Sequence, residues 1–225
     1  VPHLIVILSR CAWTLHNFRL RLIHGAEVTG SRTIAAGSDE GQWGERLKKS
    51  GVDFRSIPVS KRGVSPLIDL ILFFSLVRFF WTERPAVVHS FTIKLVIYGT
   101  IAAWVSRIPV RVVTITGLGH AFLSDDNFLR RVVEYLYRFA LARAHAVVFQ
   151  NKDDLALFLQ RGLVQASKTR LVAGSGVNLS RFNSETLPLL SLGRPTILMV
   201  ARLLKEKGVV EYVEAARAVR TQNPE

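Results

Sequence analysis

Short runs of apolar and β-branched residues alternate along the chain with longer segments in which apolar residues recur at helical spacing. This alternation is typical of strand–helix units built around a parallel sheet. Helices are expected to begin near residues 14, 40, 66, 93, 127 and 153. Strands are predicted over residues 3–9, 31–36, 52–59, 86–91, 110–116, 144–150 and 169–174.

Several predicted strands, such as "AVVHSF" and "AHAVVFQ", are almost continuously apolar, which indicates burial on both faces of a sheet. We therefore predict an α/β fold, with a Rossmann-like doubly wound parallel sheet over residues 1–174. Residues 175–194 contain Ser, Pro and Gly and are expected to form a linker. "TILMVA" then predicts a new strand, so residues 195–225 are expected to form the first strand–helix unit of a second, incomplete Rossmann-like domain.

One predicted helix, "PLIDLILFFSLVRFFW", is apolar on nearly all sides, with Asp69 and Arg78 as its charged residues. It is too short and too charged to predict a membrane span. One interpretation is a core helix that covers the sheet. The other is a helix whose aromatic side also rests on a bilayer, which Trp81 beside Arg78 and Arg84 favours.

The chain carries a formal net charge of +13, which is typical of proteins that bind nucleic acid, anionic lipid surfaces or phosphorylated small molecules. The basic pairs are scattered, and no zinc-ligand spacing, helix-turn-helix or aromatic RNA-binding pattern accompanies them. Solvated helix faces or an anionic membrane surface explain the charge better than nucleic acid does. The single cysteine, Cys11, fits a reducing compartment, and no signal peptide is evident. Because Val1 is not a methionine, we expect the natural N-terminus to lie upstream.

The first strand–helix turn, "SRCAWTLHNFRLRLI", has no G-x-G-x-x-G pattern, which argues against a nicotinamide or flavin dinucleotide enzyme. It instead places Arg10, His16, Asn17 and Arg19 after a strand, where open α/β sheets bind ligands. Arg19 could reach an anion, or it could be an ordinary solvated surface arginine. Asn17 and Arg19 are therefore candidate cleft-lining residues.

The stretch "VVHSFTIKLVIYG" places His89 at the end of the fourth strand and Lys94 at the start of the next helix. A histidine there can accept a proton from a hydroxyl or hydrogen-bond a sugar, although an isolated histidine often has a purely structural role. His89 is a candidate catalytic residue and Lys94 a candidate cleft residue.

Two glycine-containing turns follow later strands. In "TITGLGHAF", Gly117 allows backbone to approach a ligand and His120 offers a polar contact, although a tight turn alone would also need glycine. In "VAGSGVNLSRF", Ser175 and Gly176 lie in a segment that predicts either an anion-binding nest or a hinge, and Asn178 follows it.

The stretch "ARLLKEKG" places two cations, Arg202 and Lys207, before a helix that begins at Gly208. Helix N-termini are electropositive, so this arrangement predicts a site for a diphosphate.

The chain resembles family 4 retaining glycosyltransferases of the GT-B fold. The resemblance rests on six stretches in this order: "SRCAWTLHNFR", "ERPAVVHSFTIKLVIYGTIAAW", "TITGLGHAF", "VVFQNKDD", "VAGSGVNLSRF" and "ILMVARLLKEKG". The closest branch makes bacterial capsule and lipopolysaccharide. The resemblance implies an N-terminal domain that holds the acceptor and a C-terminal domain that holds a nucleotide-diphosphate sugar. It implies that Arg202 and Lys207, with Gly176, bind the donor diphosphate and replace the metal of other transferases, so no metal or cofactor is expected.

The resemblance also implies transfer with retention of configuration, to a polyprenyl-diphosphate-linked sugar or a growing lipopolysaccharide. Many members carry a histidine that contacts the donor sugar where this chain has Thr116, so Thr116 joins His89 as a candidate catalytic residue. The family's pair of glutamates falls beyond Glu225, so the chain is expected to be inactive by itself.

The sequence leaves two alternative hypotheses about function open. The first is a truncated, non-catalytic protein that binds lipid-linked glycan or the membrane. The second is a nucleic-acid-binding protein, which would leave "VARLLKEKG" unexplained. The location expected from the resemblance is the inner face of the cytoplasmic membrane, as a peripheral protein.

Overall fold

The computed structural model describes residues 3–60, 65–117, 127–180, 182–183, 196–201, 203 and 205–222. It divides into two compact units, Val1–Val177 and Asn178–Glu225, which are described separately. The first unit contains seven strands: β1 (Leu4–Cys11), β2 (Arg32–Ser38), β3 (Phe54–Ser56), β4 (Val87–Phe91), β5 (Val110–Ile115), β6 (Ala146–Phe149) and β7 (Thr169–Leu171).

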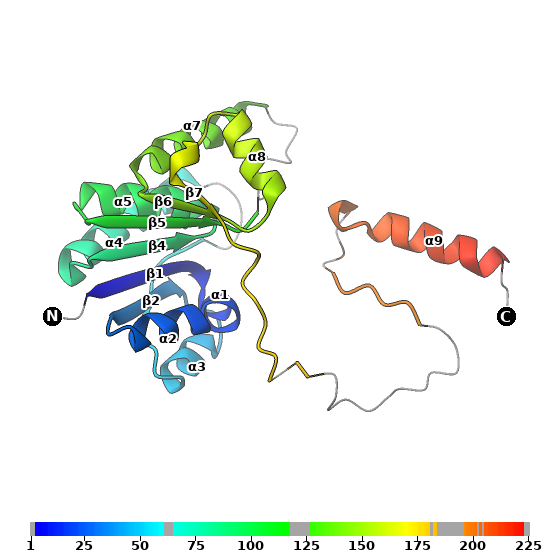
Figure 1. Ribbon diagram of the computed structural model, residues 1–225, viewed down its shortest axis with the longest axis horizontal. Coiled ribbons are helices and arrows are strands. Elements are labelled where there is room, and N and C mark those ends of the chain that lie inside the picture. The colour runs from blue at the N-terminus through cyan, green and yellow to red at the C-terminus, as the bar shows by residue number, and fades with distance from the viewer. Residues whose placement is uncertain are drawn as a thin grey trace. The chain divides into compact units, whose positions relative to one another are not determined.

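The seven strands form one sheet in the order β3-β2-β1-β4-β5-β6-β7, and every adjacent pair is parallel (Figure 1). The strand order reverses direction between β1 and β4. In open α/β sheets, ligands bind outside the carboxyl ends of the strands at such a reversal. The sheet therefore places its candidate binding edge beside the ends of β1 and β4.

The helices of the first unit connect these strands. They are α1 (Ala12–Phe18), α2 (Leu20–Val28), α3 (Trp43–Lys49), α4 (Pro66–Glu83), the π-helical turn η1 (Leu95–Gly99), α5 (Thr100–Val105), α7 (Asn127–Arg143), α8 (Lys152–Gln160) and the short 3₁₀ turn η2 (Ala166–Lys168).

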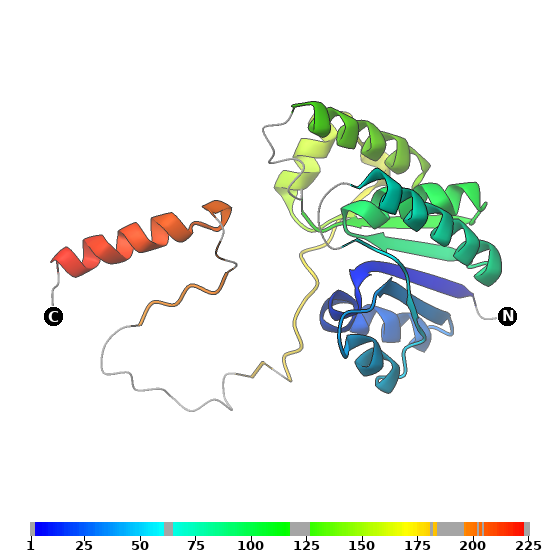
Figure 2. The same cartoon turned by 180° about the vertical axis from the view of Figure 1, so that it is seen from behind.

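Helices cover both faces of the sheet (Figures 1 and 2). Alternate residues of β1 point to opposite faces: Leu8 packs with α4 and α5, whereas Ile7 packs with α1, α2 and α3. A third apolar cluster joins β5 and β6 to α7 and α8. The predicted Rossmann-like doubly wound parallel sheet is therefore confirmed.

Several elements differ from the predicted ones by a few residues, and the differences at β3 and after β4 affect the packing of the core. β3 is only three residues long, because Ile57 and Val59 enter the core as irregular backbone rather than as strand. The helix after β4 contains the π-helical turn η1, in which Gly99 lies against β1 and β4. A Cβ atom on Gly99 would lie 3.0 Å from both Leu8 Cδ1 and Ser90 Oγ, so glycine avoids a tight contact with these two side chains.

Helix α4 begins at Pro66, as predicted, and Ser65 is its N-cap residue, although the Ser65 side chain makes no capping hydrogen bond. Its inner side, including Leu72, Leu76 and Phe80, lies in the core, which confirms the core-helix interpretation for that side. Its outer side is apolar yet exposed: the exposed apolar residues are Leu67, Ile68, Leu70, Ile71, Phe74 and Trp81. In the described part of the chain, no helix is long and apolar enough to cross a membrane.

The second unit holds the 3₁₀ turn η4 (Lys205–Lys207) and helix α9 (Val209–Gln222). The helix expected after Gly208 is present, whereas the strand expected over "TILMVA" is absent, since residues 196–201 form no strand. A strand needs a neighbour to satisfy its backbone groups, and the described residues of this unit supply none. Ile197, Leu198 and Val200 are accordingly exposed. The expected boundaries at 174 and 195 stay predictions.

Candidate functional site

The candidate site begins where β1 passes into α1 at the carboxyl edge of the sheet. The Thr14 hydroxyl donates to the Cys11 carbonyl (2.7 Å) and accepts from the Cys11 N–H (3.3 Å), which fixes the first turn of α1. Helix α1 ends at Phe18, and the chain turns at Arg19 before α2 begins. This break between two short helices directs the Arg19 side chain into the protein, where it is only 8% exposed.

Arg19 is therefore not a solvated surface arginine. Its Nη1 atom donates to the Phe18 carbonyl (3.2 Å) and to Ser175 Oγ (2.5 Å), and its guanidinium lies 4.1 Å from the centre of the Phe91 ring. Its Nε atom is buried and has no hydrogen-bond partner in the described part of the chain. Burial lowers the pKa of Arg19 to about 10, so the side chain stays charged at neutral pH.

Ser175 brings the end of β7 to this arginine. The Ser175 hydroxyl oxygen accepts from Arg19 and also from Gln150 Nε2 (3.1 Å), and Gln150 follows β6 directly. Gly174 and Gly176 on either side have φ angles of +70° and +69°, a left-handed conformation that glycine adopts without strain. The Gly-Ser-Gly turn thus carries a hydroxyl across to Arg19, 156 residues earlier in the sequence.

His89 lies on the same face of β4 as Phe91, and the two ring centres are 4.3 Å apart. Its Nε2 atom is hydrogen-bonded to Thr114 Oγ1 (2.8 Å) on the neighbouring strand β5. Burial, with a smaller contribution from the positive charge of Arg19, lowers the pKa of His89 to about 4. The imidazole is therefore neutral at pH 7 and can exchange hydrogen bonds with a ligand hydroxyl.

Lys94 is a second cation at this edge, and it is paired. Its Nζ atom lies 2.6 Å from Asp69 Oδ1 and 2.5 Å from Ser60 Oγ, and Tyr98 donates to the same carboxylate (3.4 Å). Asp69 comes from α4, so the ion pair joins α4 to the helix after β4. The positive charge of Lys94 is thus balanced within the protein.

The other predicted residues are not brought to Arg19 by any described contact. Asn17 is tied to its own helix, through Nδ2 and the Trp13 carbonyl (2.9 Å). Thr116 is exposed beyond the end of β5, and no described hydrogen bond joins it to His89. Gly117 follows with a φ angle of +144°.

Three predicted residues, Asn178, Arg202 and Lys207, belong to the second unit. Asn178 Oδ1 accepts from the Ser180 N–H (3.1 Å) in a local turn, and Lys207 ends the 3₁₀ turn with its side chain exposed. Arg202 and His120 lie outside the described residues. The diphosphate role of Arg202, Lys207 and Gly176 therefore stays a prediction.

Sequence reasoning overlooked three residues that complete these clusters: Gln150, Asp69 and Phe91. Gln150 could have been noticed because it is a polar residue at the last position of a predicted strand, the edge at which open parallel sheets bind ligands. Asp69 carried a signal too, since it is an acid inside a helix that is otherwise apolar, and such an acid needs a buried partner. Phe91 carried no signal that separates it from an ordinary core residue.

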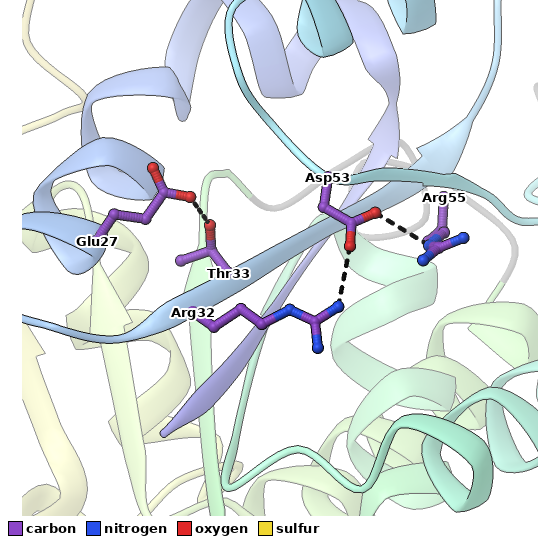
Figure 3. Close-up of polar contacts among 5 residues, drawn as sticks. All are labelled: Glu27, Arg32, Thr33, Asp53 and Arg55. Atoms are coloured by element: carbon purple, nitrogen blue, oxygen red, sulfur yellow. Dashed lines mark hydrogen bonds and ion pairs between the residues drawn. The ribbon is translucent and has the colours of Figure 1, made fainter. Parts of the chain in front are cut away.

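The amino edge of the sheet shows a different arrangement of charges (Figure 3). Asp53 accepts from two arginines, Arg32 (3.2 Å) and Arg55 (3.1 Å), whose side chains are 58% and 50% exposed. The Thr33 hydroxyl donates to Glu27 close by. These charges are paired and reached by water, so this cluster of described residues shows no sign of a missing ligand.

No group of three or more His, Cys, Asp or Glu residues that could hold a metal is present among the described residues. Whether the reaction needs a metal is a separate matter, and the expected independence from metals stays a prediction.

Comparison with known proteins points to one family. Residues 15–174 match the family described as "Glycosyl transferase 4-like domain". An N,N'-diacetylbacillosaminyl-diphospho-undecaprenol alpha-1,3-N-acetylgalactosaminyltransferase of Campylobacter jejuni is 25% identical, over 95% of this chain and 60% of the relative. A UDP-Gal:alpha-D-GlcNAc-diphosphoundecaprenol alpha-1,3-galactosyltransferase of Escherichia coli is 27% identical, over 74% of this chain and 45% of the relative.

Among solved structures, a glycosyltransferase from Rickettsia africae superimposes with a TM-score of 0.62 at 15% identity, over 98% of this chain and 58% of that chain. This likeness concerns the fold alone. The chain spans between about half and three fifths of the length of these proteins.

Proposed function

The chain belongs to the glycosyl transferase 4-like family, and from this membership we propose that it binds the acceptor in a sugar-transfer reaction on a lipid-linked glycan. Two relatives support this acceptor class, since their names specify undecaprenol-linked diphosphates. The name of the second relative also specifies a uridine-diphosphate sugar as donor. In the proposed reaction, the sugar leaves a nucleotide diphosphate and is transferred with retention of configuration.

The proposed chemistry divides between the two units. At the carboxyl edge of the sheet, neutral His89 hydrogen-bonds and orients the acceptor hydroxyl. In the second unit, Arg202 and Lys207 balance the charge that develops on the departing diphosphate, a task that electrostatic stabilisation can perform without a metal. The acceptor attacks from the face that the diphosphate leaves.

The observation that carries the membrane part of the proposal is the exposed apolar side of α4. Leu67, Phe74 and Trp81 recur at spacings of seven residues, and they are 70%, 61% and 63% exposed. Phe74 and Trp81 line a groove of about 630 Å³ that Val105 of the following helix completes. An exposed apolar stripe of this kind is typical of a helix that lies in a membrane interface.

Cations surround the end of this stripe. Arg78 lines the groove itself, while Arg84 and Arg107 line the adjoining pocket that contains Trp81. Arginines next to an interfacial tryptophan favour an anionic lipid surface. We propose that this surface of α4 rests on an anionic membrane, which would hold the chain beside its lipid-linked acceptor as a peripheral protein.

Vesicle sedimentation tests the membrane part. The chain should sediment with vesicles of phosphatidylcholine and phosphatidylglycerol, and less with phosphatidylcholine alone. The double substitution Phe74→Ser/Trp81→Ser should lower the binding constant for anionic vesicles at least tenfold, since it removes the two largest exposed aromatic groups of the groove. Trp13→Ser is the matched control, because Trp13 is exposed on α1, on the other face of the sheet. Equal binding of all three proteins to both vesicle types would refute membrane docking.

A transfer assay separates this proposal from a non-catalytic protein that only binds the lipid-linked glycan. The chain is incubated with a prenyl-diphosphate-linked sugar and a panel of uridine-diphosphate sugars, and the products are identified by mass spectrometry. For the 225-residue chain we expect acceptor binding without turnover. A protein that carries the rest of the relatives' length should transfer the sugar. Binding without transfer in that longer protein would support the non-catalytic alternative.

A further inference from the structure

We propose that Arg19, Ser175 and Gln150 form an anion site for the diphosphate group of a ligand at the carboxyl edge of the sheet. The ligand class assigned to these residues is a diphosphate. The proposal rests on the proposed function only for the molecule that carries this diphosphate, the prenyl-linked acceptor or the sugar donor. The anion site itself is argued from the charge and hydrogen bonding of the described residues.

The first step is the charge of Arg19. Its side chain is nine-tenths buried, and no carboxylate of the described chain lies within ion-pair distance of it. The face of the Phe91 ring, 4.1 Å away, offers partial compensation only. Buried charges in proteins are normally paired, because removing an ion from water is costly. An arginine that is buried without a carboxylate partner among the described residues indicates a site for an added anion.

The second step is the supply of hydrogen-bond donors. A guanidinium has five N–H groups, and Arg19 uses two of them, both on Nη1. The Ser175 oxygen already accepts from Arg19 and Gln150, so the hydroxyl hydrogen remains available as a donor. Among the described contacts, Arg19 and Gln150 both donate to Ser175 Oγ, and Nε and Nη2 of Arg19 keep N–H groups that no described acceptor receives. A phosphate group carries the acceptors that such a cluster lacks.

The third step is the position in the fold. Arg19 lies at the junction of α1 and α2, which follow β1, whereas Gln150 follows β6 directly and Ser175 lies four residues after β7. The carboxyl edge of an open parallel sheet is where such folds bind ligands. Lys94, the cation that follows β4 at this edge, does not compete for the anion, because Asp69 already balances its charge.

Binding of inorganic pyrophosphate to the 225-residue chain, measured by calorimetry at low ionic strength, tests the site. Arg19→Met keeps the apolar stem but removes the charge and the donors, and should raise the dissociation constant at least tenfold. Ser175→Ala, at an exposed position that spares the fold, should raise it about threefold to fivefold. Arg32→Gln is the matched control at the amino edge and should change it less than twofold. Unchanged affinity in both Arg19→Met and Ser175→Ala would overturn the proposal.

Two further measurements keep the test decisive. In the absence of anions, Arg19→Met should melt at the same temperature as the parent or higher, because it removes an unpaired buried charge. A large loss of melting temperature would instead mark Arg19 as a structural residue and count against the site. If Lys207→Ala abolishes pyrophosphate binding while Arg19→Met preserves it, the diphosphate site lies in the second unit and the proposal fails.

Competition then identifies the source of the diphosphate. Displacement of pyrophosphate by geranyl diphosphate, but not by uridine diphosphate, assigns the site to a prenyl-linked acceptor. The reverse result assigns it to the sugar donor, and either result supports the anion site. If neither ligand competes better than pyrophosphate itself while Arg19→Met still abolishes binding, the anion site stands and the proposed acceptor function falls.

Discussion

The two edges of the sheet handle positive charge in different ways. At the amino edge, Arg32 and Arg55 share Asp53 in contact with water (Figure 3). At the carboxyl edge, Lys94 is paired with the buried acid Asp69, and Arg19 is buried without an acid. Water screens the amino-edge charges, so their pairing contributes little to stability. At the carboxyl edge, burial weakens this screening, so the pairing of each charge affects stability more strongly. The carboxyl edge is also where a parallel sheet of this kind binds ligands.

The largest effect is expected from removing Asp69, the acid of the carboxyl edge. Asp69→Ala leaves Lys94 partly buried with no carboxylate partner and should lower the free energy of unfolding by about 3–5 kcal/mol. Urea unfolding followed by circular dichroism measures the change. The double substitution Asp69→Leu/Lys94→Met, which replaces both charges by apolar groups, should recover most of the loss. A loss below about 1 kcal/mol for Asp69→Ala would show that the two edges do not differ in this way.

A second test uses pH, because the carboxyl edge holds a buried histidine. The pKa of His89 is lowered to about 4 in the folded state, whereas an unfolded histidine titrates near 6.5. Between these values the unfolded chain binds the proton and the folded chain does not, so stability falls as the pH drops from 6.5 toward 4. Above pH 6.5 both states are neutral and His89 has no effect on the pH dependence.

The contribution of His89 reaches at most about 3 kcal/mol at pH 4. It is measured as the difference in urea-unfolding free energy between the parent and His89→Asn, at intervals from pH 7.5 to 4.5. The variant should lose less stability than the parent over this range. Parallel pH profiles would show that His89 is not held neutral by burial.

The arrangement of the carboxyl edge was only partly predictable from the sequence. The apolar runs and helical spacings predicted the class of fold and the region of every strand in the sheet, because these patterns are local. They also predicted that Arg19, His89 and Ser175 lie near strand ends. The contact between Arg19 and Ser175 depends on tertiary packing across 156 residues, which no local pattern encodes.

Two local interpretations were settled only by neighbours in space. "TILMVA" has strand character but forms no strand, since strand formation requires a partner that local propensity cannot supply. The helix "PLIDLILFFSLVRFFW" was expected to be either core or membrane-facing. It has a core side, while its outer apolar side is exposed and carries the membrane proposal.

The close packing that supports the carboxyl edge offers a third test. Gly99 lets the helix that begins beside Lys94 approach β1 and β4, and a Cβ atom there would lie 3.0 Å from Leu8 and Ser90. Gly99→Ala should therefore destabilise the fold by about 1–3 kcal/mol, as overpacking does. Gly25→Ala is the control, because a Cβ atom on Gly25 meets nothing within 4 Å. Thermal unfolding of both variants checks the difference, and equal melting temperatures would show that the helix shifts without cost.

The smallest effect on stability is expected from removing Asp53, the acid of the amino edge, and it is compared with the effect of removing Asp69. Asp53→Asn removes the charge that Arg32 and Arg55 share, yet the free energy of unfolding should change by less than about 1 kcal/mol, because all three side chains are reached by water. The effect should also shrink as sodium chloride is raised from about 10 mM to about 500 mM, because the Debye length shortens from about 30 Å to about 4 Å and exposed charges are then more strongly screened. Asp69→Ala, measured under the same salt series, should keep most of its effect, since a buried pair is poorly screened. If Asp53→Asn proved as costly and as insensitive to salt as Asp69→Ala, exposure would not be what separates the two edges, and the absence of an acid beside Arg19 would lose its significance.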